Sequence, residues 1–176
     1  MVTCDITGAS RGTELELVKQ LTAVSGTPAS KIFAITRGSS SLPEEIISSS
    51  PTRVVNIACK DPCSEEVVLR DVNEALKHAD PIDVLSGAWR SFSTASKTDS
   101  ISSIKRLRAM SGHSYKISKA LMTTLTAFYA VERNDFVVVA ISPRWLRTDS
   151  AGPDADLPVE FGVSVFWKRH SRGKEI

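Results

Sequence analysis

Short β-prone runs alternate with helically patterned segments along most of this chain. Apolar residues recur every three or four positions in the helical segments, whereas the strand-like runs are rich in Val, Ile and Phe. This alternation predicts βαβ units and a parallel sheet. The strand-like runs are residues 2–6, 31–36, 53–58, 83–85 and 136–141, of which the last is continuously apolar, as in a central strand covered on both faces.

The segment from residue 61 to residue 78 carries a clear amphipathic helical pattern. Ser64 is a candidate N-cap, and Val67, Val68, Val72 and Leu76 form one apolar face. Residues 89–100 have the composition of a loop. Further helical segments are expected after residue 12, at 44–47, from 112 to about 133 and over 157–170.

The composition is that of one globular domain spanning residues 1–176. The 22 basic and 20 acidic residues are scattered, so the sequence has no footprint of a nucleic-acid binder. The three cysteines form no C-x-x-C motif, which indicates free thiols in a reducing compartment. No apolar run is long enough to span a membrane, and the N-terminus starts directly in strand-like sequence. We therefore expect a cytoplasmic protein without a nucleic-acid or membrane partner.

The first strand-like run leads directly into a glycine-containing turn and then into a helical pattern. Glycines at such a junction let the backbone approach a pyrophosphate, and the helix N-terminus offers unpaired N–H groups to it. The alternative is a tight turn between strand and helix that binds no ligand. The candidate cofactor-binding residues in this turn are Thr7, Gly8, Ser10, Arg11 and Gly12.

Arg37 follows the second strand-like run. In a dinucleotide-binding fold this position meets the adenosine ribose, where an acidic side chain favours a free 2′-hydroxyl and an arginine favours a 2′-phosphate. Arg37, helped by Arg11, therefore predicts NADP as the cofactor. The alternative for either arginine is an ordinary solvated loop charge.

Tyr115 and Lys119 lie four residues apart at the start of a helical run. Residues with this spacing share one face of a helix. An ammonium held near the phenol, in a site that also binds a positively charged cofactor ring, would lower the tyrosine pKa and make Tyr115 a proton donor to a carbonyl. The alternative is a chance pair on an exposed helix face, because this spacing alone is common.

These segments together resemble the short-chain dehydrogenase/reductase family, in the right order and over nearly the whole chain. Residues 7–12 match the family's T-G-x-x-x-G-x-G turn, and residues 115–119 match its Y-x-x-x-K motif. Residues 142–149 are similar to the P-G-W-V-x-T-D segment that lies over the nicotinamide in the family. Pro143 and Thr148 are the matching positions for cofactor binding.

The resemblance implies roles for the remaining site residues. Tyr115 would be the acid/base, and Lys119 would lower its pKa and hold the nicotinamide ribose. Ser102 or Ser103, twelve or thirteen residues before Tyr115, would polarise the carbonyl of a small-molecule carbonyl or alcohol substrate. Which of the two serines has this role stays open.

The chain also departs from the family pattern. Glu14 replaces the third glycine of the cofactor turn, and Arg144 replaces a glycine after Pro143. Between Ala88 and Ser103 the chain is too short for a helix and a strand that relatives have, although residues 100–104 could form an abbreviated strand. We therefore expect a Rossmann-like, doubly wound parallel sheet with helices on both faces, lacking one helix and most of one strand. A homo-oligomer is an open alternative to a monomer, since relatives commonly pair through the missing helix.

Two classes of function follow from these patterns. The first is an NADP-dependent oxidoreductase of the ketoreductase or alcohol dehydrogenase type. The second is a truncated, catalytically impaired relative that keeps the motifs as ancestry. The preserved tyrosine, lysine and serines favour the first class, and Glu14 with the shortened segment favours the second.

Overall fold

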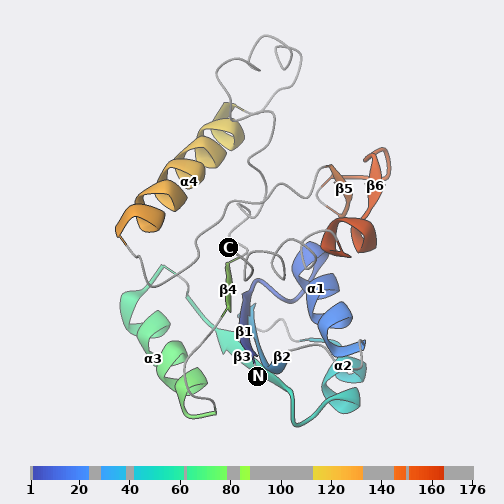
Figure 1. The fold of residues 1–176 in the computed structure, drawn as a ribbon, viewed down its shortest axis with the longest axis vertical. Coiled ribbons are helices and arrows are strands. Elements are labelled where there is room, and N and C mark those ends of the chain that lie inside the picture. The colour runs from blue at the N-terminus through green and yellow to red at the C-terminus, as the bar shows by residue number, and fades with distance from the viewer. Residues whose placement is uncertain are drawn as a thin grey trace. The chain divides into compact units, whose positions relative to one another are not determined.

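The computed structural model divides the chain into two compact units, Met1–Trp89 and Arg90–Ile176, and we treat each by itself (Figure 1). The prediction of one domain over residues 1–176 stays a prediction. The structure describes residues 2–23, 29–38, 42–61, 63–78, 84–87, 113–132, 145–149 and 151–164.

A four-stranded parallel sheet forms the centre of the first unit, in the order β3-β2-β1-β4. The sheet confirms the predicted parallel arrangement. The predicted strand at 136–141 and the abbreviated strand at 100–104 lie outside the described residues. The strands are β1 (Val2–Thr7), β2 (Ala29–Arg37), β3 (Val54–Cys59) and β4 (Val84–Gly87).

Helices cover both faces of this sheet, as predicted, with α1 and α2 on one face and α3 on the other (Figure 1). Because side chains alternate along a strand, Cys4 and Ile6 point to the face opposite that of Asp5. α1 buries Leu17, Val18 and Leu21 on its side of the sheet. The helices are α1 (Gly12–Ala23), α2 (Glu44–Ser49) and α3 (Glu65–Leu76).

α3 begins where the sequence predicts, but its apolar face does not pack on the sheet. Ser64 is the N-cap, and its hydroxyl accepts a hydrogen bond from Val67 N–H at 3.5 Å. The residues of α3 that are buried are Asp71 and Ala75. Ala75 joins Phe33 and Ile57 in a core cluster, because a small side chain lets the helix approach β3 closely. Of the residues on the predicted apolar face, Val67 is half-buried, and Val68, Val72 and Leu76 are exposed.

In the second unit, the described residues form one long helix, a two-stranded parallel pairing and a short helical segment. α4 (His113–Glu132) spans 20 residues and confirms the helix predicted from residue 112. β5 (Leu146–Arg147) pairs with β6 (Leu157–Pro158), and residues 159–164 are helical. Gly162 lies where a Cβ would collide with the side chain of Leu146. Among the described helices, none is long and apolar enough to cross a membrane.

A carboxylate is buried in the middle of β1. Asp5 is 3% exposed and pairs in register with Phe33, which is fully buried. No described residue donates a hydrogen bond to Asp5 Oδ1. Burial without a partner disfavours the charged form and raises the pKa of Asp5 from 3.8 to about 6.

We predict that Asp5 makes folding stability depend on pH in a defined direction. The folded state favours the neutral carboxyl of Asp5. The contribution of this carboxyl to the free energy of unfolding is therefore fully present below the unfolded pKa of 3.8, and it is lost as the pH rises through about 6. A shift of this size corresponds to about 3 kcal/mol. Asparagine does not titrate, so Asp5→Asn removes this loss. As the pH rises from acidic to neutral, the free energy of unfolding of the Asp5→Asn protein should therefore increase by about 3 kcal/mol relative to that of the original chain.

Urea unfolding of both proteins at a series of pH values measures this difference. A stability difference that stays constant across the series would contradict the assignment, because it would mean that Asp5 titrates equally in the folded and unfolded states.

Candidate cofactor and catalytic site

The glycine turn is tied to the end of the neighbouring strand. Gly8 N–H and Ala9 N–H both donate to the carbonyl oxygen of Ile35, at 2.8 and 3.0 Å. Gly8 and Gly12 have φ values of 78° and 67°, in the region that side chains with a Cβ rarely adopt. The turn therefore brings its backbone over the carboxyl end of the sheet and starts α1 there.

This turn offers groups that fit the pyrophosphate of a dinucleotide. The first N–H groups of α1 have no partner within the helix and mark its positive dipole end. Thr7, the last residue of β1, has a buried hydroxyl oxygen with no hydrogen-bond partner among the described residues. A buried polar atom without a partner, next to a glycine turn, is suited to a ligand hydroxyl, phosphate or ordered water.

Both predicted arginines lie at this edge of the first unit. Arg37 is the last residue of β2, two residues beyond Ile35, and its side chain is exposed. Arg11 is exposed in the glycine turn itself. Because parallel strands end at the same edge, Arg37 and the turn lie at the same edge of the sheet. Gly38 then turns the chain away, with a φ of 59° and its N–H donating to Cys59 O at 2.9 Å.

Glu14 places a carboxylate over the same turn. A Cβ added at Gly12 would lie 3.6 Å from Glu14 Oε2, so this oxygen lies beside the start of α1. A carboxylate in the first turn of a helix is favourable for the helix dipole. It is unfavourable for a phosphate that approaches the same N–H groups, since the two anions repel each other.

The predicted catalytic pair lies in the second unit. Tyr115 and Lys119 are both in α4, about one turn apart along the helix. Thr148 is half-buried just after β5, and its carbonyl oxygen accepts hydrogen bonds from Ala151 N–H at 3.0 Å and Gly152 N–H at 2.9 Å. Ser102, Ser103 and Pro143 lie outside the described residues. The prediction that Tyr115 and Lys119 face the glycine turn stays a prediction.

Sequence reasoning missed a polar cluster between β3 and α3. Asp71 is 4% exposed, and its Oδ1 accepts hydrogen bonds from Arg70 at 3.0 and 2.6 Å. Burial, and then the hydrogen bond and negative charge of Asp71, raise the pKa of the Cys59 thiol to about 11. Cys59 is therefore protonated at neutral pH and is not a nucleophile. The signal for this cluster in the sequence is Asp71, a charged residue that lies between the apolar positions Val68 and Val72 of α3.

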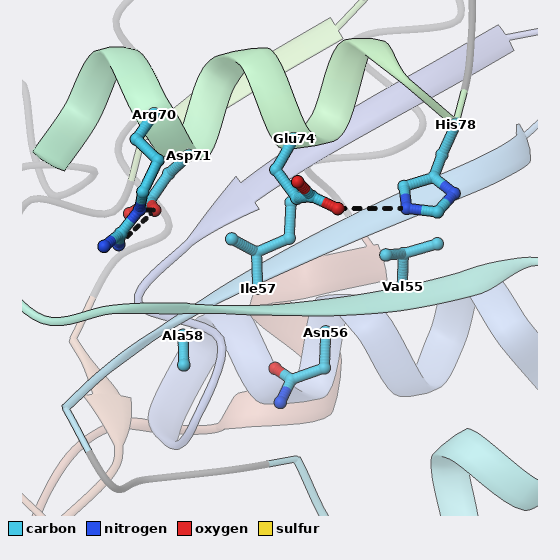
Figure 2. A pocket seen from close by; sticks show the side chains of 8 residues that line it. All are labelled: Val55, Asn56, Ile57, Ala58, Arg70, Asp71, Glu74 and His78. Carbon is cyan, nitrogen blue, oxygen red and sulfur yellow. Dashed lines mark hydrogen bonds and ion pairs between the residues drawn. The ribbon is translucent and has the colours of Figure 1, made fainter.

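A cavity of about 310 Å³ adjoins this cluster at the edge of the sheet, as Figure 2 shows. Its charged groups largely neutralise one another: Arg70 pairs with Asp71, and Glu74 pairs with Lys77 at 2.7 Å and lies 3.6 Å from His78. Lys77 lowers the pKa of Glu74. Within the described ranges, no group of three or more His, Cys, Asp or Glu side chains could hold a metal ion. The cavity is lined by Val55, Asn56, Ile57, Ala58, Arg70, Asp71, Glu74 and His78.

Comparison with known proteins identifies the fold through structure rather than sequence. No protein-family model matches the chain, and no curated protein matches it by sequence. An NADPH-bound carbonyl reductase from chicken fatty liver matches with a TM-score of 0.76 and 21% identity, over 94% of this chain and 89% of that one.

Two further solved structures give the same result. A short-chain dehydrogenase/reductase from Burkholderia multivorans with bound NADP has a TM-score of 0.67 and 18% identity, over 95% of this chain and 89% of that one. The carbonyl reductase Sniffer of D. melanogaster has a TM-score of 0.61 and 18% identity, over 96% and 90%. The shared architecture is the Rossmann-type parallel sheet.

Proposed function

We propose that this chain, which has the fold of the short-chain dehydrogenases/reductases, is an NADP-dependent oxidoreductase. It would move a hydride between a nicotinamide and the carbonyl or alcohol carbon of a small molecule. The observation that carries the proposal is the glycine turn, in which Gly8 and Gly12 are left-handed and the chain is tied to the end of β2 near Arg37. Two similar solved structures are described as holding NADPH or NADP, which supports this choice of cofactor.

The proposed cofactor-binding residues come from the turn after β1, the end of β2 and the positions that resemble the family's nicotinamide segment. The backbone of Gly8 to Gly12, with the side chains of Thr7, Ser10 and Arg11, would hold the pyrophosphate. Arg37 would bind the 2′-phosphate through charge-assisted hydrogen bonds, which are stronger than neutral ones. In the second unit, Lys119, Pro143 and Thr148 would hold the nicotinamide ribose and ring.

The catalytic residues of the proposal are Tyr115, Lys119 and one of the serines at 102 and 103. The bound cofactor supplies or accepts the hydride. Tyr115 donates a proton to the carbonyl oxygen as that oxygen gains negative charge. The ammonium of Lys119 stabilises the phenolate that remains, and Ser102 or Ser103 orients the carbonyl by a hydrogen bond.

The setting that we propose is the cytoplasm. All three cysteines, Cys4, Cys59 and Cys63, are free, which fits a reducing compartment. We propose that residues 1–176 act as one dinucleotide-binding domain.

Tyr115→Phe tests the catalytic assignment. Loss of the proton donor should lower carbonyl-dependent oxidation of NADPH by at least about 100-fold. NADPH affinity, measured by fluorescence titration, should stay unchanged because the phenol acts on the substrate. Tyr129→Phe, which alters the only other tyrosine, is the matched control and should keep its activity. An active Tyr115→Phe protein would refute the role.

Arg37→Ala tests the choice between NADP and NAD. The unmodified chain should bind NADPH more tightly than NADH, and the substitution should remove most of that preference by lowering NADPH affinity about tenfold or more. Lys60→Ala removes another exposed cation that follows a strand of the same sheet, and it should leave the preference intact. Equal affinities of the unmodified chain for the two cofactors would overturn the assignment of Arg37.

A second candidate function is a non-catalytic relative that binds cofactor weakly or not at all. The observation that favours it is the carboxylate of Glu14 next to Gly12, where it stabilises the helix start and repels a phosphate. Titration of the unmodified chain with NADPH distinguishes the two candidates. A chain that binds no cofactor cannot be the reductase.

Glu14→Gly tests whether this carboxylate limits cofactor binding. The substitution should cost about 1 kcal/mol of stability, because glycine is a poor helix residue, while it tightens NADPH binding by removing an anion. Glu16→Gly in the same helix should lose similar stability without the gain in affinity. If Glu14→Gly leaves NADPH affinity unchanged, the cause of weak binding lies in the shortened segment between Ala88 and Ser103.

A further inference from the structure

β1 carries a column of polar side chains on one face of the sheet. Thr3, Asp5 and Thr7 alternate with Cys4 and Ile6, so these three polar residues share a face. Thr3 is 7% exposed and Asp5 is 3% exposed, which places the column inside the protein. A strand between two neighbours in a parallel sheet ordinarily presents apolar side chains there. The polar column therefore needs hydrogen-bond partners that an apolar strand would not need.

Two oxygen atoms of this column are buried and have no hydrogen-bond partner among the described residues, Asp5 Oδ1 and Thr7 Oγ1. Residues two positions apart in a strand lie about 6.6 Å apart on the same face. A water molecule that bonds to two oxygen atoms spans about 5.5 Å between them, so one water can reach both atoms. Gly87 of β4 lies in register with Thr7, and the absence of a side chain there leaves room beside the hydroxyl.

The surroundings of Asp5 contain few groups that could respond to its charge. Its neighbours in register are Phe33 and Leu85, and burial is the cause of its raised pKa. α3 packs on the same face, where Ala75 contacts Phe33. Charged side chains of α3 next to the sheet and at its edge are already paired: Asp71 with Arg70, and Glu74 with Lys77. The charged residues of the glycine turn and of the start of α1, which covers the opposite face (Figure 1), are Arg11 and Glu14.

The charge of Asp5 would set the direction of the Thr7 hydroxyl through such a water. An ionised carboxylate accepts a hydrogen bond from the water, and the water oxygen then accepts one from the Thr7 O–H. A protonated carboxyl donates to the water instead, and the water donates to Thr7 Oγ1. In that second state the Thr7 O–H is free to donate to a phosphate oxygen at the glycine turn.

We propose that one ordered water joins the Asp5 carboxyl to the Thr7 hydroxyl, and that Asp5 is thereby a positioning residue of the cofactor turn. Asp5 does not touch the cofactor, and it acts through the direction of the Thr7 O–H. The inference rests on the proposed binding of NADP at this turn. It implies that the neutral form of Asp5 favours an anionic ligand, so that cofactor binding weakens as Asp5 ionises.

The relay itself is tested without cofactor, by carbon-13 NMR titration of the Asp5 carboxyl. Thr7→Val removes the hydroxyl and keeps a β-branched side chain of similar size. The ionised carboxylate then loses a hydrogen-bonded partner, so the pKa of Asp5 should rise by about 0.5 or more. Thr7→Ser keeps the hydroxyl and should leave this pKa unchanged. Circular dichroism checks the fold of each variant, and an unchanged pKa in folded Thr7→Val protein would overturn the relay.

The positioning role is tested by calorimetric titration with NADP at about pH 5 and about pH 8. At the lower pH, Asp5→Asn protein and the unmodified chain should bind NADP alike. At the higher pH, Asp5→Asn protein should bind about tenfold more tightly, because the Thr7 O–H remains free to donate to the phosphate. The 2′-phosphate of the cofactor also titrates near pH 6, but its effect is common to both proteins and cancels in the ratio of their affinities.

A double substitution separates the relay from simple repulsion between Asp5 and the cofactor. In a Thr7→Val background, Asp5→Asn should no longer change NADP affinity at either pH. A change that persists there, or an affinity ratio that does not depend on pH, would overturn the positioning role of Asp5. Absence of NADP binding in every variant would overturn the proposed function and the positioning role with it, and the NMR titration distinguishes that result from failure of the relay.

Discussion

The pairing of β1 with its two neighbours is the constraint on which the first unit depends. Thr7, the last residue of β1, lies in register with Ile35 of β2 and with Gly87, the last residue of β4. The glycine turn then returns two backbone N–H groups to Ile35 O, which holds the turn over that edge. Arg37 reaches the same edge because β2 continues two residues further. The candidate cofactor site is therefore a consequence of backbone hydrogen bonds and strand length.

Two carboxylates set the balance between stability and binding in this unit. Asp5 is buried in the sheet without a described partner for Oδ1, so the folded state favours its neutral form. Glu14 lies at the positive end of α1 and stabilises the helix start, although the same position would hold a phosphate more weakly. Glu14 therefore stabilises the start of α1 and would weaken the binding of an anionic ligand at the same place.

α3 shows how a polar contact can decide which face of a helix is buried. Asp71, held by Arg70 and next to the Cys59 thiol, occupies a position that an apolar side chain would ordinarily take. Ala75 completes the contact because it is small enough to lie against Ile57 and Phe33. The larger apolar side chains Val68, Leu69, Val72 and Leu76 are left exposed.

The local pattern of the sequence was sufficient to predict the parallel sheet, the positions of its helices and the glycine turn. Strand alternation, the Ser64 cap and the turn glycines act over a few residues, so their signals are readable in the chain. The strand order β3-β2-β1-β4 depended on pairing between strands that are distant in the sequence. The same pairing decided that Arg37 and the glycine turn lie at one edge of the sheet. The side of α3 that faces β3 was decided only by tertiary packing, since amphipathicity describes how apolar residues are distributed but not which contacts fit. Ala75 and Asp71 fit against β3, whereas Val72 and Leu76 do not take part there.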